Sequence, residues 1–364
     1  MSLWSEVKST LSLTRLFLSG WTARRFGTRC SQLPVANVMV VDRCNSRCRG
    51  CDIWKHRPDT PPELTTEEIL GLLPALRGLK TRIVSFAGGE PTLRDDLETC
   101  IKAFRDAGMH VHMSSNGLAI DADLARSLAE AGLSVVRISC DHVTPEGYKA
   151  ARGVDGYDKA VAAMRHFRSL PRPLNVCVNV VISRLNQDYI CKFPERAVEW
   201  GVQKVQFIPI HMHLQHRRMD PEVFDPLVPS TEDTPGIIAD LKRATERLRE
   251  AGIRTNLSYF IDHFDLAYKP VRPVPCMAGI FSVHITPFGE VVPCYQLSTG
   301  LNVRDMPLDR ILRSREFRQM RRRVACCGMP CWDVGYAKSS LMYHIPYLLR
   351  HPAEAMQQVR FNTP

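Results

Sequence analysis

Three cysteines, Cys44, Cys48 and Cys51, stand close enough in the sequence for one short loop to wrap an iron–sulfur cluster. Ferredoxin-type sequences provide four cysteine ligands to each [4Fe–4S] cluster. A set of three therefore leaves one iron without a protein ligand, and that open iron can bind a substrate or a cofactor. A zinc knuckle is the alternative, although its usual pattern is a C-x2-C pair with a second pair at a distance.

A second group of cysteines lies near the C-terminal end. Its members are Cys276, Cys294, Cys326, Cys327 and Cys331. In a reducing compartment, cysteines at short spacings are metal ligands or catalytic groups more often than disulfides. Five other cysteines stand singly and are expected to be small buried hydrophobic residues. They are Cys30, Cys100, Cys140, Cys177 and Cys191.

Short β-branched runs alternate with helical segments between residues 36 and 255, which predicts a parallel sheet covered by helices. The candidate strands are Ala36–Val41, Arg82–Phe86, His110–Ser114, Val135–Ser139, Asn175–Ile182 and Lys204–Ile210. The candidate helices are Glu67–Leu76, Asp95–Ala107, Ala122–Ala131, Tyr157–Arg168, Gln187–Trp200 and Ile237–Ala251. Six such units are too few to close an eight-stranded barrel. The predicted fold class is therefore α/β, with an open, partial (β/α)6 TIM-like barrel.

Pro270, Pro273 and Pro275 mark a boundary after this alternation. The following residues, from 276 to about 335, are expected to form a small cysteine-rich module with a hairpin that joins 281–286 to 291–292. The sequence thus predicts four parts. They are an amphipathic helical segment at 1–35, the barrel at 36–255, the cysteine-rich module at 256–335 and a helical tail at 336–364.

Polar motifs follow several predicted strands, at the end of a βα barrel where reactive groups gather. In chain order they are Gly88-Gly89-Glu90-Pro91, Ser114-Ser115-Asn116-Gly117, Ser139-Cys140-Asp141 and Arg152-Gly153. Together with the cysteine loop, these segments resemble the motifs of the radical S-adenosylmethionine (SAM) superfamily. The resemblance covers roughly residues 36 to 255.

This resemblance implies that Cys44, Cys48 and Cys51 hold a [4Fe–4S] cluster whose open iron chelates the amino and carboxylate groups of SAM. It also implies that Glu90 and its glycines contact the methionine ammonium, and that the later motifs approach the ribose and the carboxylate. The implied cofactor-binding residues are Gly88, Gly89, Glu90, Ser115, Asn116, Ser139, Asp141 and Arg152. The implied activity is reductive cleavage of SAM to a 5′-deoxyadenosyl radical, with flavodoxin or ferredoxin as the electron donor.

The C-terminal module is similar to the SPASM/Twitch extensions of this superfamily, which carry auxiliary [4Fe–4S] clusters. A full SPASM domain has more cysteines and holds two clusters, whereas five cysteines are available here. We therefore expect one auxiliary cluster of the shorter Twitch type, with a structural zinc as the alternative. The expected ligands are Cys276, Cys294, Cys327 and Cys331, with Cys326 as the alternative to Cys327.

His211, His213 and His216 follow the sixth predicted strand and should lie near the mouth of the barrel. We expect His211 or His213 to contact the substrate or to carry a proton, because the pKa of histidine lies close to neutrality. A metal site and a plain loop are the alternatives. Further catalytic candidates on similar grounds are Tyr295, Tyr259 and Asp333.

The net charge of +10 predicts attraction to an anionic partner. Arg321, Arg322 and Arg323 form the densest basic run and are expected on a solvated helix face. No recognisable RNA-binding domain accompanies this charge, so nucleic acid is not an expected partner. No apolar run reaches the ~18–20 residues of a membrane span and no signal peptide is evident, so we expect a cytoplasmic protein.

Both ends of the sequence carry apolar residues next to basic ones. The N-terminal stripe consists of Trp4, Val7, Leu11, Leu18 and Trp21, and the C-terminal stretch is 341–349. A helix of this kind can lie on an anionic lipid surface or pack against the barrel. The basic flanks slightly favour peripheral contact with the inner membrane surface.

Three functions fit this sequence. The preferred one is a radical SAM enzyme that oxidises, epimerises or cross-links a small-molecule or lipid-linked substrate. The second is an enzyme that modifies ribosomal peptides. Such enzymes usually have a leader-binding domain before the cluster loop, where this chain has 43 residues, although a separate protein can bind the leader. The third is a non-enzymatic iron–sulfur or zinc protein that binds nucleic acid, which leaves Glu90 and the strand-end motifs unexplained.

Overall fold

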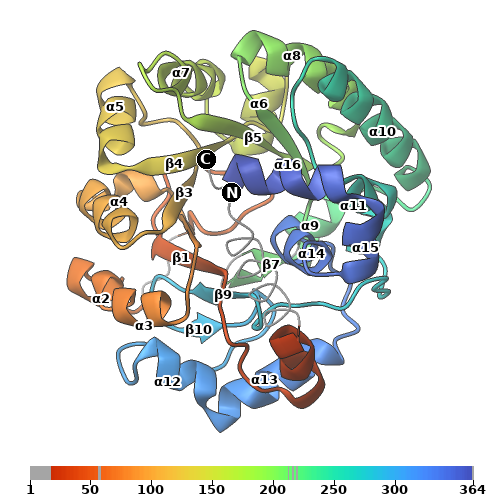
Figure 1. Ribbon diagram of the computed structural model, residues 1–364. Coiled ribbons are helices and arrows are strands. Elements are labelled where there is room, and N and C mark those ends of the chain that lie inside the picture. Colours follow the sequence, from red (N-terminus) through yellow and green to blue (C-terminus); the bar gives the residue numbers. More distant parts are fainter. Residues whose placement is uncertain (1–17, 56–58, 212, 215–216, 219, 363–364) are drawn as a thin grey trace, which may run out of the picture.

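Parallel strands form the centre of the protein, which we describe from a computed structural model (Figure 1). The structure describes residues 18–362 apart from 56–58, 212, 215–216 and 219. Six strands lie side by side in chain order and run parallel. They are β1 (Val35–Val41), β2 (Ile83–Gly88), β3 (His110–Ser115), β4 (Leu133–Ser139), β5 (Asn175–Ile182) and β6 (Lys204–Pro209). The predicted open, partial (β/α)6 barrel is confirmed.

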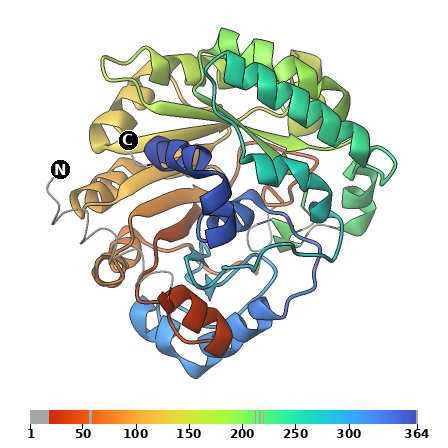
Figure 2. The same ribbon diagram turned by 45° about the vertical axis from the view of Figure 1, so that its right-hand side comes forward.

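Helices cover the outer face of this sheet, as Figures 1 and 2 show. They are α2 (Thr66–Leu70), α3 (Leu73–Gly78), α4 (Leu97–Asp106), α5 (Ala122–Ala131), α6 (Pro145–Arg152), α7 (Tyr157–Arg168), α8 (Phe193–Trp200) and α10 (Thr234–Glu250). Alternate strand residues such as Val111, Val136 and Val205 are fully buried in the apolar core beneath them. Their neighbours along each strand point to the other face, because side chains alternate in a strand. The helices therefore enclose an apolar layer outside the barrel and leave its inner face to other residues.

Capping residues mark both ends of α5, whose predicted bounds are confirmed. Asp121 accepts a hydrogen bond from the Leu124 N–H at the start of α5, and Gly132 ends that helix with a φ of 104°. Two predicted helices are each divided in the structure. Residues 67–76 form α2 and α3, and 187–200 begins as a 3-10 helix (Gln187–Lys192) before α8. A proline lies at the start of both α3 and α8, where its missing N–H costs least.

The C-terminal module extends the barrel sheet rather than standing beside it. The predicted hairpin is present as β9 (Ser282–Ile285) and β10 (Val291–Val292), which pair antiparallel. Strand β9 also pairs parallel with β1, a contact that the sequence analysis did not predict. The result is one eight-stranded sheet in the order β10-β9-β1-β2-β3-β4-β5-β6. The module is thereby held next to the strand that leads into the first cysteine loop.

Helices complete the C-terminal part of the chain. They are α12 (Leu308–Arg313), α13 (Arg315–Ala325), α14 (Val334–Leu341), α15 (Ile345–Arg350) and α16 (Pro352–Asn362). Helix α16 lies across the barrel, near the ends at which β5 and β6 begin (Figure 1). Shorter elements are α9 (Pro221–Phe224), α11 (Ser258–Asp262), β7 (His213–Leu214) and β8 (Arg217–Arg218).

The N-terminal apolar stripe lies only partly within the described residues. Trp4, Val7 and Leu11 lie outside the described residues, whereas Leu18 and Trp21 are more than half exposed. The helical segment at 18–26 packs through Ala23 on a small cluster of the C-terminal module. Within the described part of the chain, no helix is long and apolar enough to cross a membrane.

The prediction that the arginine run forms a solvated face is wrong for Arg321. Its side chain is 2% exposed, and its guanidinium donates to the carbonyls of Gly279 and Leu312, each at 2.8 Å, and to that of Gly27 at 3.4 Å. The neighbouring Arg322 and Arg323 are exposed as predicted. Arg321 thus holds α13 against the cysteine-rich module, because its guanidinium donates hydrogen bonds to three buried carbonyls.

We expect Arg321→Met to lower the free energy of unfolding by roughly 2–3 kcal/mol, because it leaves buried carbonyls without a donor. Chemical denaturation monitored by circular dichroism measures this change. Arg322→Met is the matched control and should change stability by less than about 0.5 kcal/mol, as is usual for an exposed site. Equal stabilities of the two variants would contradict the structural role assigned to Arg321.

Candidate iron–sulfur and cofactor site

The loop after β1 carries Cys44, Cys48 and Cys51, all three partly buried. Local contacts orient the sulfurs: the Ser46 N–H lies 3.5 Å from the Cys44 Sγ, and the Ser46 Oγ lies 3.3 Å from the Cys48 Sγ. Burial raises the pKa of the Cys44 thiol to about 11 and that of Cys51 to about 12. Thiolates so far from water need a bound cation, which the irons of a cluster supply. The donor set therefore fits the predicted cluster.

The last turn of α6 anchors this loop. The N–H groups of Arg47 and Arg49 donate to the carbonyls of Arg152 and Ala151, at 3.1 and 3.0 Å. Gly153 ends the helix with a φ of 68°, and a Cβ on it would lie 2.2 Å from the Arg47 carbonyl oxygen. The sequence analysis singled out Arg152-Gly153 but missed α6 itself, whose signals are the Thr144 cap and a proline in its first turn.

A buried ion pair between Arg152 and Asp141 fixes the position of the same helical turn. Arg152 Nε lies 2.7 Å from Asp141 Oδ2, and its Nη1 lies 3.6 Å from the Cys48 Sγ. Although burial disfavours the cation, the Asp141 carboxylate raises the pKa of Arg152 above its ordinary value. The other oxygen of Asp141 accepts from the Val181 N–H on β5, at 2.8 Å. The structure thus brings Asp141 and Arg152 together, and Ser139 lies just before Asp141 at the end of β4.

Glu90 joins the loops after β1, β2 and β3. Its carboxylate is fully buried and accepts from the Ser115 Oγ and the Asn116 N–H, both at 2.7 Å. The Asn116 amide in turn donates to the Asn45 Oδ1 at 2.7 Å, in the cysteine loop. Burial raises the pKa of Glu90, while these donors favour its charged form. Ser115 and Asn116 are therefore brought beside the cysteines through Glu90.

The two glycines before Glu90 allow the loops to approach this closely. A Cβ on Gly88 would lie 2.1 Å from the Val41 carbonyl oxygen, and one on Gly89 would lie 2.0 Å from that of Arg43. Gly88 also has a φ of 133°, which side chains with a Cβ rarely adopt. The glycines thus bring β2 against the strand that leads into the cysteine loop.

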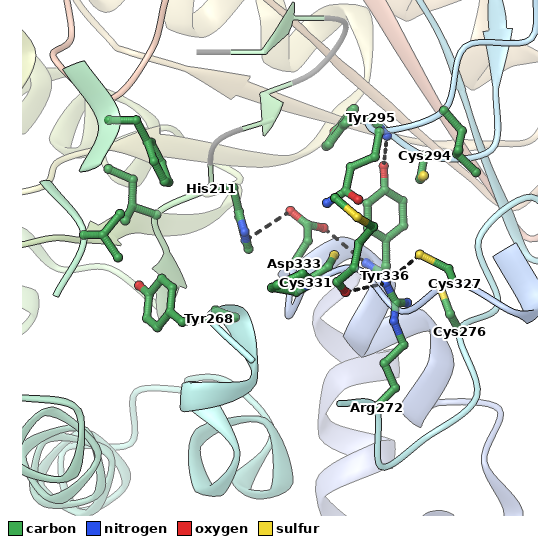
Figure 3. Close-up of a pocket in the computed structure, with 18 of the residues that line it drawn as sticks. His211, Tyr268, Arg272, Cys276, Cys294, Tyr295, Cys327, Cys331, Asp333 and Tyr336 are labelled. Carbon is green, nitrogen blue, oxygen red and sulfur yellow. Dashed lines mark hydrogen bonds and ion pairs between the residues drawn. The ribbon is translucent and has the colours of Figure 1, made fainter. Parts of the chain in front are cut away.

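The second set of cysteines lines one cavity of about 780 Å³, shown in Figure 3. Cys276, Cys294, Cys327 and Cys331 all contribute to its wall, whereas Cys326 is exposed and does not. Arg272 Nη2 lies 3.5 Å from the Cys327 Sγ. Burial raises the pKa of Cys294 and of Cys331 to about 12. This arrangement favours Cys327 over Cys326 as the fourth ligand of an auxiliary cluster.

Among the described residues, no three His, Cys, Asp or Glu side chains form a group that could hold a metal ion. The cysteines of an iron–sulfur cluster bind its separate irons, whereas zinc draws all four ligands to one centre.

Most of the cysteines that stand singly are buried as predicted. They are Cys30, Cys100, Cys140 and Cys177, while Cys191 is partly buried and its thiol lies 3.4 Å from Asp240 Oδ1.

The catalytic candidates divide between the cavity and other places. His211, Tyr295 and Asp333 line the cavity, and His211 Nε2 lies 3.8 Å from Asp333 Oδ2 (Figure 3). His213 lies in the short strand β7 and its side chain is outside the described part, as is the whole of His216. Tyr259 instead stacks on His263, with ring centres 4.1 Å apart.

Three further residues of the cavity wall escaped the sequence analysis. Tyr336 accepts a hydrogen bond at its hydroxyl from the Tyr295 N–H at 3.0 Å, and Tyr268 and Arg272 face the same space. Only Arg272 carried a signal, because it lies within the proline-rich boundary segment. The tyrosines have no motif around them and are identified by packing alone.

We expect Gly153→Ala to reduce the free energy of unfolding by at least roughly 2 kcal/mol more than Gly201→Ala. Both glycines end helices with a φ of 68°, but a Cβ on Gly201 meets no atom within 4 Å. The difference in unfolding free energy between the two variants therefore reports on the contact between Gly153 and the cysteine loop. Thermal unfolding and the iron retained after reconstitution measure it, and equal losses in the two variants would show that this contact does not hold the loop.

Comparison with known proteins agrees with this arrangement. The radical SAM superfamily matches residues 38–193, and an iron–sulfur cluster-binding domain (SPASM) matches residues 276–332. A PqqA peptide cyclase of Xanthomonas campestris is 30% identical over 286 residues, covering 76% of this chain and 72% of the relative. A probable GTP 3′,8-cyclase of Saccharolobus islandicus is 30% identical over 188 residues, covering 51% of this chain and 59% of the relative.

The fold also matches solved structures. Streptococcus suis SuiB bound to the precursor peptide SuiA superposes with a TM-score of 0.63 at 14% identity, covering 86% of this chain and 72% of that one. The cysteine loop, the barrel and the second cysteine-rich module therefore have one explanation: the chain belongs to the radical SAM superfamily, as an enzyme with a [4Fe–4S] cluster, SAM and a C-terminal SPASM-type iron–sulfur domain.

Proposed function

We propose that this radical SAM enzyme modifies a peptide by forming a cross-link within it. The observation that carries the proposal is the match to PqqA peptide cyclases over 286 residues, which is longer than the barrel alone. The match to the probable GTP cyclase spans 188 residues. The peptide interpretation therefore replaces the small-molecule or lipid-linked substrate that the sequence analysis preferred, and no observation favours contact with a membrane.

The cavity between the barrel and the C-terminal module is the proposed peptide site. Its volume of about 780 Å³ lies within the usual range of ligand sites. Tyr268, Tyr295 and Tyr336 give it aromatic walls, while Arg184 and Arg323 add positive charge. Ring faces and fixed cations suit the amide groups and the side chains of a peptide better than a plain lipid chain.

The reaction takes two hydrogens from the peptide. When bound, SAM and the clusters supply a 5′-deoxyadenosyl radical that removes one hydrogen atom and an oxidised iron–sulfur centre that accepts one electron. Forming the cross-link also releases a proton, which must go to a side chain or to water. His211 lines the cavity and lies 3.8 Å from Asp333, so we assign it the role of holding this proton. Ferredoxin or flavodoxin is the proposed electron donor.

The proposed ligands follow the two groups of cysteines. Cys44, Cys48 and Cys51 hold the cluster that binds SAM, and the loops joined through Glu90 and Arg152 orient that cofactor. Asp141 keeps Arg152 in place across the 2.7 Å ion pair. For the auxiliary cluster, the proposed ligands are Cys276, Cys294, Cys327 and Cys331, which line the same cavity. The cluster would occupy the part next to these cysteines and leave the part beside His211 and Tyr268 to the peptide (Figure 3).

The test uses the reconstituted protein with SAM, dithionite and synthetic peptides from short reading frames adjacent to its gene. We expect one of these peptides to lose the mass of two hydrogens, detected by mass spectrometry, while 5′-deoxyadenosine forms. His211→Gln should still cleave SAM but yield at least tenfold less product per 5′-deoxyadenosine, because the proton has no acceptor. The exposed Lys159→Met is the control and should match the wild type. If no peptide changes mass while a small metabolite is consumed, the proposal fails.

A further inference from the structure

The inner face of the barrel carries a cluster of positive charges that the reaction described above does not use. Strand register places Arg137 beside Cys177 and Cys177 beside Lys204, on the neighbouring strands β4, β5 and β6. Neighbouring strands lie about 4.8 Å apart, so the three side chains share one face and one level. Lys338 of α14 lines the same small void as Lys204. We call Arg137, Lys204 and Lys338 the cationic cluster.

Helix α16 closes the barrel on one side of the cationic cluster (Figure 1). Lys204 Nζ donates to Gln358 Oε1 at 2.8 Å, and the ring of Phe361 packs with Val135 and Cys177. The Asn362 carbonyl lies 2.7 Å from His112 Nε2, so α16 is bound to strand β3 as well. The cluster therefore lies on the floor of the barrel, opposite the ends of the strands that carry the cofactor motifs.

No acidic group neutralises these charges among the residues that the structure describes. Arg137 donates to His112 Nδ1 at 2.8 Å, which makes that histidine a neutral acceptor. Burial is the main cause that lowers the pKa of Lys204 to about 8 and that of Lys338 below its ordinary value, and the neighbouring cations lower both pKa values further. Within the described part of the chain, Cys177 is the neighbour whose negative charge would raise these pKa values. Like charges gathered in a protein interior, where the dielectric constant is low, are costly unless a counter-ion is present.

Polar side chains continue from the cationic cluster toward the cofactor end. Ser139, Asn179 and Gln206 stand two residues further along β4, β5 and β6, on the same inner face. Two residues of strand span roughly 6.6 Å, so this row separates the cluster from the end of β4, where Asp141 follows. Arg137, Ser139, Asn179 and Lys338 are each partly exposed rather than closed off. Polar and partly exposed side chains thus line the barrel interior as far as the cationic cluster.

A small void adjoins the cluster. Its volume is about 10 Å³, which is enough for one water or one oxygen atom of a ligand. The residues that line it include Lys204, Gln206, Lys338 and Gln358. A phosphate group, with four oxygens, needs more room than this. A carboxylate can place one oxygen there, next to Lys204 and Lys338. The planar guanidinium of the partly exposed Arg137, on the same inner face, is of the kind that matches carboxylates well.

We propose that the cationic cluster binds a carboxylate of the peptide substrate, either an acidic side chain or a chain end, at the floor of the barrel. This inference rests on the proposed function and names a feature of its substrate. A carboxylate held there fixes the depth to which the peptide enters the barrel. The peptide carbon that faces the cofactor end is then determined by its distance from the acidic group.

The test measures binding to the reconstituted holoenzyme without turnover. The probes are N-acetylglutamate methylamide and its uncharged counterpart, N-acetylglutamine methylamide. Calorimetry and thermal shift measure the binding of each probe at constant ionic strength. We expect the glutamate compound to bind at least tenfold more tightly. Lys338→Met should remove that preference without lowering the melting temperature of the unliganded enzyme, because methionine keeps the apolar stem and removes a repelled charge. Lys159→Met, on the exposed face of α7, should bind as the wild type does.

Three results would overturn the inference. The first is equal affinity of the two probes for the wild-type enzyme. The second is a Lys338→Met enzyme that still prefers the glutamate compound. Displacement of the glutamate compound by an equal concentration of chloride would indicate a site for inorganic anions only. Binding of the glutamate compound in an enzyme that modifies no peptide would instead leave this site in place and count against the proposed function alone.

Discussion

The buried ion pair between Asp141 and Arg152 is the interaction on which the rest of the site depends. Its atoms lie 2.7 Å apart, and the turn of α6 that contains Arg152 also receives the backbone of the cysteine loop. Two charges so deeply buried are tolerated only as a pair with further hydrogen bonds, which here come from the Val181 N–H and reach the Cys48 sulfur. Loss of either charge would leave the other unpaired beneath the cluster loop.

Glu90 is a second buried charge that positions the cysteine loop. Its carboxylate is fully buried but receives hydrogen bonds from Ser115, Asn116 and Thr92. The loops after the first three strands thus meet at one anion, and the loop after β4 meets strand β5 at Asp141. The second cysteine group is positioned differently, through the pairing of β9 with β1. Sheet continuity, rather than a separate domain interface, sets its place beside the barrel.

The sequence was sufficient to predict the six strands, most helix ends and the place of each motif, because these depend on local periodicity and capping. It was also sufficient to group Cys44, Cys48 and Cys51, since they share one loop. The pairing of β9 with β1 and the burial of Arg321 were not predictable, because partners more than two hundred residues apart and burial of a charge leave no local signal. The cationic cluster escaped for the same reason, since Lys338 reaches the void beside Lys204 only through tertiary packing.

The central claim is that the loop of Cys44, Cys48 and Cys51 holds the cluster that cleaves SAM, while the second group of cysteines holds another. The most direct measurement is the iron content and 5′-deoxyadenosine yield of the anaerobically reconstituted protein, beside a variant with all three cysteines changed to alanine. The account predicts about eight irons in the wild type and about four in the variant, which should form no 5′-deoxyadenosine. Cleavage of SAM by the triple variant, or zinc in place of iron, would contradict it.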